Sequence, residues 1–135
     1  MNAQRFHLIL HILLAVFLVG TGSVGLISFY AAPESMDIPE GPGRAFFEAV
    51  IATGWLFQWV AFFKVVAGIA MLFPRTRAVG VLATVPYAVN IFLWTLFGNP
   101  GDLPMGAIVL ILTFLLVRSH WEVYAPIFRS KAPGK

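Results

Sequence analysis

The chain of 135 residues contains no cysteine and very few charged residues. The absence of cysteine excludes disulfide scaffolds, thiol redox chemistry, cysteine-ligated metals and thiol nucleophiles. Only 11% of the residues are charged, against about 25% in an average soluble domain. The nine Lys and Arg residues are too few and too scattered for a phosphate-binding surface, so the pI of 9.7 does not indicate a nucleic-acid partner.

Hydrophobic residues, in contrast, are abundant. They make up 59% of the sequence, and the mean hydropathy is +0.86. A soluble protein of this size has too much surface for its volume to hide so many apolar side chains. We therefore expect a single domain, residues 1–135, whose solvent is the lipid bilayer.

Four apolar stretches predict membrane-spanning helices, which need roughly 20 apolar residues each. They cover residues 8–30, 55–74, 78–97 and 104–124. The fourth is strictly apolar only to Val117, but Trp121 and Tyr124 are typical of the headgroup level. The runs do not alternate as barrel strands do, and the first is too long for the apolar region of a cleaved signal peptide.

The connections between these stretches are short or rich in turn residues. Residues 31–44 hold three prolines and two glycines and predict a loop, while 74–77 and 98–102 predict tight turns. Residues 45–53 are apolar but too few to span, so we expect a half-helix that lies on or dips into the membrane. The sequence thus predicts an all-α integral membrane protein, a four-helix up-down bundle with a short extra half-helix before its second helix.

Basic residues predict which way the helices cross. With four spans, both termini and the 74–77 turn share one side of the membrane. That side carries seven of the nine basic residues, Arg5, Arg75, Arg77, Arg118, Arg129, Lys131 and Lys135, and the other side carries only Arg44. Because Lys and Arg are retained in the cytoplasm, we expect cytoplasmic N- and C-termini.

The ninth basic residue, Lys64, lies in the centre of the second span. A lysine at this depth costs about 2.5–3.5 kcal/mol of insertion free energy, so it needs partners inside the protein. Ala61 and Gly68 share its helix face and are small enough to let another helix approach closely. We expect Lys64 to point into the bundle, where Gly20, Gly22, Ser23 and Gly25 of the first span could meet it.

Asn90 of the third span is the predicted partner of Lys64. Both residues lie about 18–21 Å along their helices from the turn at Thr76. Pro86, one turn before Asn90, frees a backbone carbonyl because it has no N–H. With Gln58, these residues form a candidate polar centre, which we interpret either as a ligand, quinone-headgroup or proton site or as a hydrogen-bonded cluster that fixes helix register.

No other motif indicates chemistry. His7 and His11 have the i, i+4 spacing of metal ligands, but no third ligand lies at a matching depth. We expect both, and His120, to lie at the cytoplasmic surface and to bind no metal. The chain has no Gly-x-Ser-x-Gly, phosphate-binding loop, dinucleotide fingerprint or paired carboxylates. We therefore expect no catalytic residue and no cofactor, and a protein that is not an enzyme.

Several short motifs resemble the DoxX-like family of small bacterial membrane proteins, over roughly residues 8–128. They are Ala-Thr-Gly-Trp-Leu-Phe at 52–57, Lys-Val-Val-Ala-Gly at 64–68, Pro-Tyr-Ala-Val-Asn-Ile at 86–91, Gly-Asn-Pro at 98–100 and Trp-Glu-Val-Tyr-Ala-Pro at 121–126. The resemblance implies four spanning helices in a bacterial inner membrane. Ala67 and Thr95 stand where many members of that family carry Glu and His, which removes two titratable groups.

Two functions follow as hypotheses. The first, which draws on the resemblance, is a non-catalytic subunit or scaffold of a redox-stress or respiratory membrane complex, with a protein partner. The alternative is a small oligomeric ligand-binding or transport protein, with a quinone-like or anionic ligand near Lys64. The first span contains no acidic residue, which argues against a small multidrug exporter.

Overall fold

The computed structural model describes residues 3–31, 36 and 40–128, which form helices and no strand. Residues 1–2, 32–35, 37–39 and 129–135, which include Arg129, Lys131 and Lys135 and much of the predicted 31–44 loop, lie outside this description. The elements are α1 (Ala3–Ala31), α2 (Arg44–Ala52), α3 (Leu56–Leu72), α4 (Arg77–Leu93), the π-helical turn η2 (Trp94–Gly98), the 3-10 turn η3 (Pro100–Asp102), α5 (Leu103–Ser119) and α6 (Trp121–Phe128). The predicted all-α class is confirmed for the described residues.

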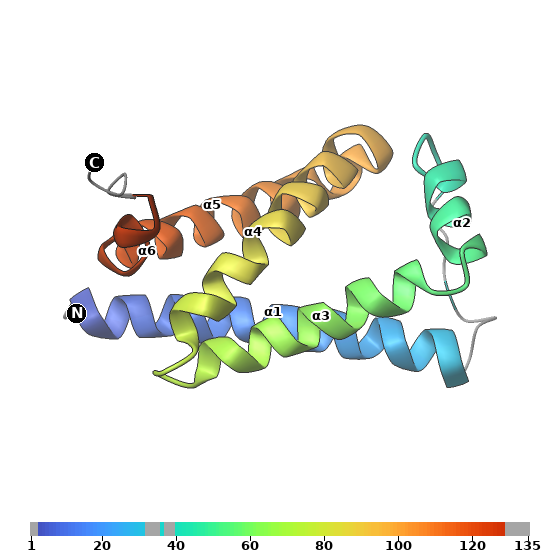
Figure 1. Cartoon of the computed structure of the whole chain (residues 1–135). Coiled ribbons are helices and arrows are strands. Elements are labelled where there is room, and N and C mark those ends of the chain that lie inside the picture. Colours follow the sequence, from blue (N-terminus) through green and yellow to red (C-terminus); the bar gives the residue numbers. More distant parts are fainter. Residues whose placement is uncertain (1–2, 32–35, 37–39, 129–135) are drawn as a thin grey trace, which may run out of the picture.

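The two helices α1 and α3 lie side by side along most of their length (Figure 1). A β-carbon at Gly22 of α1 would lie only 2.7 Å from the carbonyl oxygen of Ala61 in α3. A β-carbon at Gly68 of α3 would lie 2.7 Å from the side chain of Val19 in α1. These contacts bring the two backbones together, as the small residues in both stretches predict.

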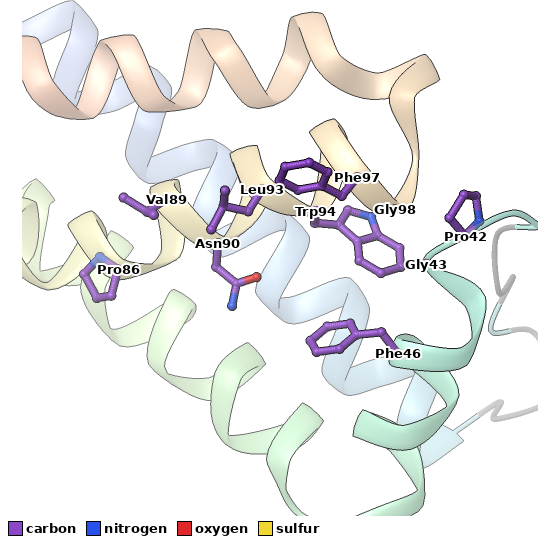
Figure 2. Close-up of a pocket in the computed structure, with 10 residues that line it drawn as sticks. All are labelled: Pro42, Gly43, Phe46, Pro86, Val89, Asn90, Leu93, Trp94, Phe97 and Gly98. Carbon is purple, nitrogen blue, oxygen red and sulfur yellow. The ribbon is translucent and has the colours of Figure 1, made fainter.

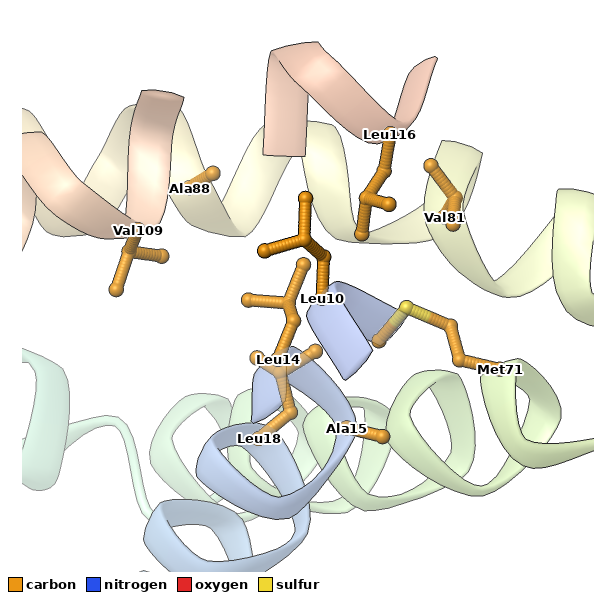
Figure 3. Close-up of a cluster of buried hydrophobic side chains, with 9 residues drawn as sticks. All are labelled: Leu10, Leu14, Ala15, Leu18, Met71, Val81, Ala88, Val109 and Leu116. Carbon is orange, nitrogen blue, oxygen red and sulfur yellow. The ribbon is translucent and has the colours of Figure 1, made fainter. Parts of the chain in front are cut away.

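A cluster of buried apolar side chains joins this helix pair to α4 and α5 (Figure 3). It consists of Leu10, Leu14, Ala15 and Leu18 from α1, Met71 from α3, Val81 and Ala88 from α4, and Val109 and Leu116 from α5. Gly80 of α4 lets α3 approach, since a β-carbon there would lie 2.8 Å from the carbonyl oxygen of Ala67. The four long helices are therefore held together chiefly by close packing.

The start of α1, the α3–α4 turn and α6 gather at one end of the molecule, and α2 stands across the other (Figure 1). The predicted half-helix is present as α2, whose axis makes an angle of 93° with that of α3. The chain bends at Gly54, whose φ of +74° is a left-handed conformation that glycine adopts without a steric penalty. The segments on either side of this bend thus become separate helices.

The tight turn between α3 and α4 supplies partners for the last carbonyl groups of α3. The hydroxyl of Thr76 donates to the carbonyl oxygen of Ala70 at 2.8 Å. The Nε of Arg77 donates to the carbonyl oxygen of Met71 at 3.1 Å. A helix end leaves four carbonyls without a helical partner, so these two bonds satisfy two of the carbonyls at the end of α3.

The fourth predicted helix, 104–124, is not continuous. Helix α5 ends at Ser119, and α6 begins at Trp121 after a break at His120. The break turns Tyr124 inward, where its hydroxyl donates to the carbonyl oxygen of Ala78 and its side chain is only 3% exposed. Tyr124 therefore packs against the start of α4, a contact that the sequence did not predict.

The outward surface of the described helices is rich in large apolar side chains. Val16, Val24, Val79 and Ile111 are each more than half exposed. In the part of the chain that the structure describes, three helical stretches are long and apolar enough to cross a membrane: Arg5–Ala31, Arg77–Gly98 and Pro100–Ser119. The bent pair of α2 and α3 makes a fourth if it is counted as one.

The contact between α1 and α3 can be tested at Gly22, with Gly20 as the control position. Gly22→Leu should destabilise the protein, because overpacking a close contact costs about 1–3 kcal/mol. Gly20→Leu should have little effect, since no atom lies within 4 Å of the position of its β-carbon. Thermal unfolding of both variants in the same detergent measures the difference, and equal stabilities would show that α1 and α3 do not pack through Gly22.

Candidate functional site

A pocket of about 610 Å³ lies between α2 and the second half of α4 together with η2 (Figure 2). Its lining is mostly apolar and includes the rings of Phe46, Trp94 and Phe97. Asn90 is the one residue of the lining with a polar side chain other than the Trp94 indole. The pocket therefore suits an apolar molecule that carries a small polar group.

Two glycines hold α2 against the end of α4. The N–H of Gly43 donates to the carbonyl oxygen of Gly98 at 3.2 Å. A β-carbon at Gly43 would lie 2.8 Å from the Cα of Gly98 and closer still to the indole of Trp94. The sequence did not identify these glycines as parts of a site, although the Pro-Gly and Gly-Asn-Pro signals mark both segments as turns.

Two of the four predicted site residues line this pocket together. Pro86 and Asn90 lie one helical turn apart on α4, and in Figure 2 the amide of Asn90 extends away from the helix into the pocket. The side chain of Asn90 is exposed, and among the described residues no hydrogen bond to it is found. An amide in this position is available to a ligand.

Lys64 does not line the pocket. Its side chain is half-buried, and its β-carbon lies 3.1 Å from the position that a β-carbon of Gly22 would take. The residue thus packs at its base against α1, beside one of the small residues that the sequence predicts to meet it. In the part of the chain that the structure describes, Lys64 makes no hydrogen bond with Asn90 and no ion pair.

Gln58 lies in a second pocket, of about 490 Å³, where the end of α1 meets the start of α3. Tyr30, Trp55 and Trp59 form much of its wall. The Nε2 of Gln58 donates to the carbonyl oxygen of Gly54 at 2.9 Å, and its Oε1 is buried without a partner in the described part of the chain. The structure therefore divides the predicted polar centre into a Pro86–Asn90 pocket, the Gln58 pocket and Lys64 on α3.

Ala67 and Thr95 both lie where two helices are in close contact. Ala67 is buried where α3 meets Gly80 of α4. Thr95 is fully buried, and its hydroxyl donates to the carbonyl oxygen of Phe92 at 3.0 Å while it contacts Gly106 of α5. Either site would have to open to admit a larger or charged side chain.

The histidines differ from the sequence-based prediction. His11 is buried, with 2% of its surface exposed, and its Nε2 lies 3.2 Å from the Nε2 of His120. His120 is thus neither isolated nor fully at the surface. Over the described residues no three His, Cys, Asp or Glu side chains come together as metal ligands.

Comparisons of the chain with protein-family models, with curated proteins and with solved structures found no match.

The division of the polar residues predicts that Lys64 and Asn90 act independently. Lys64→Met and Asn90→Leu should change the free energy of unfolding additively, within about 0.5 kcal/mol, in the double variant. Thermal or denaturant unfolding in detergent of the two single variants and the double measures the coupling. A coupling well above this value would mean that the two side chains interact directly.

Proposed function

We propose that the protein is a multi-pass membrane protein of the DoxX-like type, placed in a bacterial inner membrane, and that it serves as a non-catalytic subunit or scaffold of a membrane complex. The observation that carries the membrane part of the proposal is the apolar surface. Large apolar side chains cover the outward faces of all four long helices. Such a surface is stable in lipid and aggregation-prone in water.

In this proposal α1, α3, α4 and α5 cross the bilayer in an up-down arrangement, and α2 lies at the outer face. Arg5, Arg75, Arg77 and Arg118 belong to the start of α1, the α3–α4 turn and the end of α5. Glu48 and Asp102 belong to the opposite end, in α2 and η3. This distribution supports cytoplasmic termini.

A non-catalytic role is supported by how the polar side chains are used. The buried hydroxyls of Thr84 and Thr113 donate to carbonyl oxygens of their own helices, each at 2.8 Å. The ion pair that the described residues contain, Arg44 with Glu48, lies exposed on α2. These groups stabilise helices, and the broad apolar faces remain for lipid and for a partner protein.

The subunit role is tested by extraction in a mild detergent followed by native mass spectrometry. We expect the tagged protein to retain a second protein in fixed stoichiometry, because a subunit binds through a surface fitted to its partner. An unrelated four-span protein with the same tag is the control. Recovery of a pure oligomer of this chain, without another protein, would contradict the role.

A second candidate function is binding of a quinone-like ligand in the pocket between α2 and α4. The specific observation is Asn90, whose amide faces an apolar pocket without a partner in the described residues. An unpaired amide in hydrocarbon is unfavourable, and a ligand carbonyl would accept its N–H.

The ligand hypothesis predicts a difference between two matched variants. Asn90→Leu should lose a co-purified small molecule, since the amide that pairs with it is gone. Gln58→Leu, which alters the other pocket, should retain it. Lipid and quinone extraction followed by mass spectrometry compares the two, and equal retention would contradict binding at Asn90.

A further inference from the structure

Two histidines from distant parts of the chain meet at the end of the molecule that carries α6. His11 belongs to α1, and His120 forms the break between α5 and α6. Their Nε2 atoms are 3.2 Å apart, and the ring centroids are 5.0 Å apart with the ring planes inclined by 28°, so the rings meet at their Nε2 edges. The contact therefore ties α1 directly to the α5–α6 junction.

The positions of the protons in this pair follow from its other hydrogen bond. The Nδ1 of His11 lies 2.6 Å from the carbonyl oxygen of His7. A carbonyl oxygen can only accept, so Nδ1 must carry the hydrogen. In neutral His11 the Nε2 is then an acceptor, and the Nε2 of His120 must donate to it. One N–H thus lies between the two rings.

The free ring nitrogens determine how many added protons this pair can bind. A first added proton fits on the Nδ1 of His120, because the N–H between the rings is undisturbed and becomes a charge-assisted donor. A second added proton has only the Nε2 of His11 left, and two N–H groups would then face each other at 3.2 Å. The hydrogen bond would be replaced by repulsion between two cations.

We propose that His11 and His120 form a two-histidine proton site, which keeps α1 joined to the α5–α6 junction with up to one added proton and releases the junction when both rings are charged. The proposal concerns the fold of this chain and does not depend on the proposed function. The site binds protons, and the contact between α1 and the α5–α6 junction therefore depends on pH.

The groups around the pair oppose the second proton. They are His7 from α1, Arg77 from α4 and the ring of Tyr124 from α6. Burial lowers the pKa of His120, the charges of Arg77 and His7 act in the same direction, and the backbone of Ser119 acts against them. Among the described residues no acid faces the pair to compensate a double charge.

The direction of the pH effect follows from the number of protons that each form can hold. The joined pair holds one added proton at most, whereas two released imidazoles can each bind one, so below the ordinary histidine pKa of about 6.5 the released chain binds more protons than the joined form. The contact is therefore fully stable above that pH and is lost progressively below it. Acidification should release α6 from α1 and leave the hydrogen bond from Tyr124 to Ala78 to hold it.

The test measures the distance between α1 and α6 in lipid nanodiscs. Because the chain has no native cysteine, Ile9→Cys and Val123→Cys at exposed positions provide two clean sites for spin labels. We expect a narrow distribution of distances at about pH 8 and a longer, broader one at about pH 5. An unchanged distribution across this range would overturn the proposal.

Two variants separate the pair from other pH effects. The amide of His120→Gln has an N–H donor at a similar distance from the backbone, and its oxygen can accept a hydrogen bond when His11 is protonated. Because the amide cannot titrate, the short distance between α1 and α6 should persist at both pH values. His7→Ala keeps the backbone carbonyl that orients His11 and should still open at low pH, because the two rings that titrate are both retained. Opening of His120→Gln at low pH, or loss of the response in His7→Ala, would contradict a site made by His11 and His120.

Nitrogen NMR of the native chain, without spin labels, gives a second measurement that needs no variant. With only three histidines in the sequence, ring-¹⁵N labelling should assign each one. We expect His11 to be protonated on Nδ1 near pH 8 and to share a hydrogen bond with His120. Protonation of His11 on Nε2, or a chelator-sensitive signal that reveals a bound metal, would overturn the assignment.

Discussion

Close packing at glycine is the interaction on which the arrangement of the helices depends. Helix α1 meets α3 at Gly22 and Gly68, and α3 meets α4 at Gly80. Apolar side chains gain little by leaving lipid for protein, so helices in a bilayer associate where small residues let backbones approach. Each of these positions has a backbone or branched side chain of the neighbouring helix within about 3 Å of where a β-carbon would be. The packed core of Figure 3 forms around the same contacts.

The two ends of the molecule differ because polar contacts are unequally distributed. At the α6 end, the His11–His120 contact, the Tyr124 hydroxyl and the Arg77 side chain link α1, α3, α4 and α6. At the other end the Gly43–Gly98 contact joins the start of α2 to η2, and the pocket beside Asn90 remains open. One end is thus fastened by hydrogen bonds between elements, and the other offers space for a ligand.

The sequence predicts the helices well and their side-chain pairings poorly. Apolar runs, prolines and glycines locate α1 to α5 and the separate half-helix α2, because these signals act within one segment. The break at His120, the His11–His120 contact and the separation of Asn90 from Lys64 depend on how helices rotate about their axes. Lys64 and Asn90 were predicted to be partners because they lie at the same distance along their helices from the turn at Thr76. Equal depth does not determine which face of α3 meets which face of α4. The burial of His11 could have been suspected, since it lies on the same face as Leu14 and Leu18.

Cysteine accessibility tests most directly whether four helices cross the membrane while α2 remains on one side. Ala45→Cys and Ala52→Cys place a thiol at each end of α2 at exposed positions, and Arg75→Cys places one in the α3–α4 turn. In intact cells, a membrane-impermeant maleimide should label both α2 positions and should label Arg75→Cys only after the cells are opened. Labelling of Ala45→Cys and Ala52→Cys from opposite sides would show that α2 crosses the bilayer and would contradict the four-span arrangement.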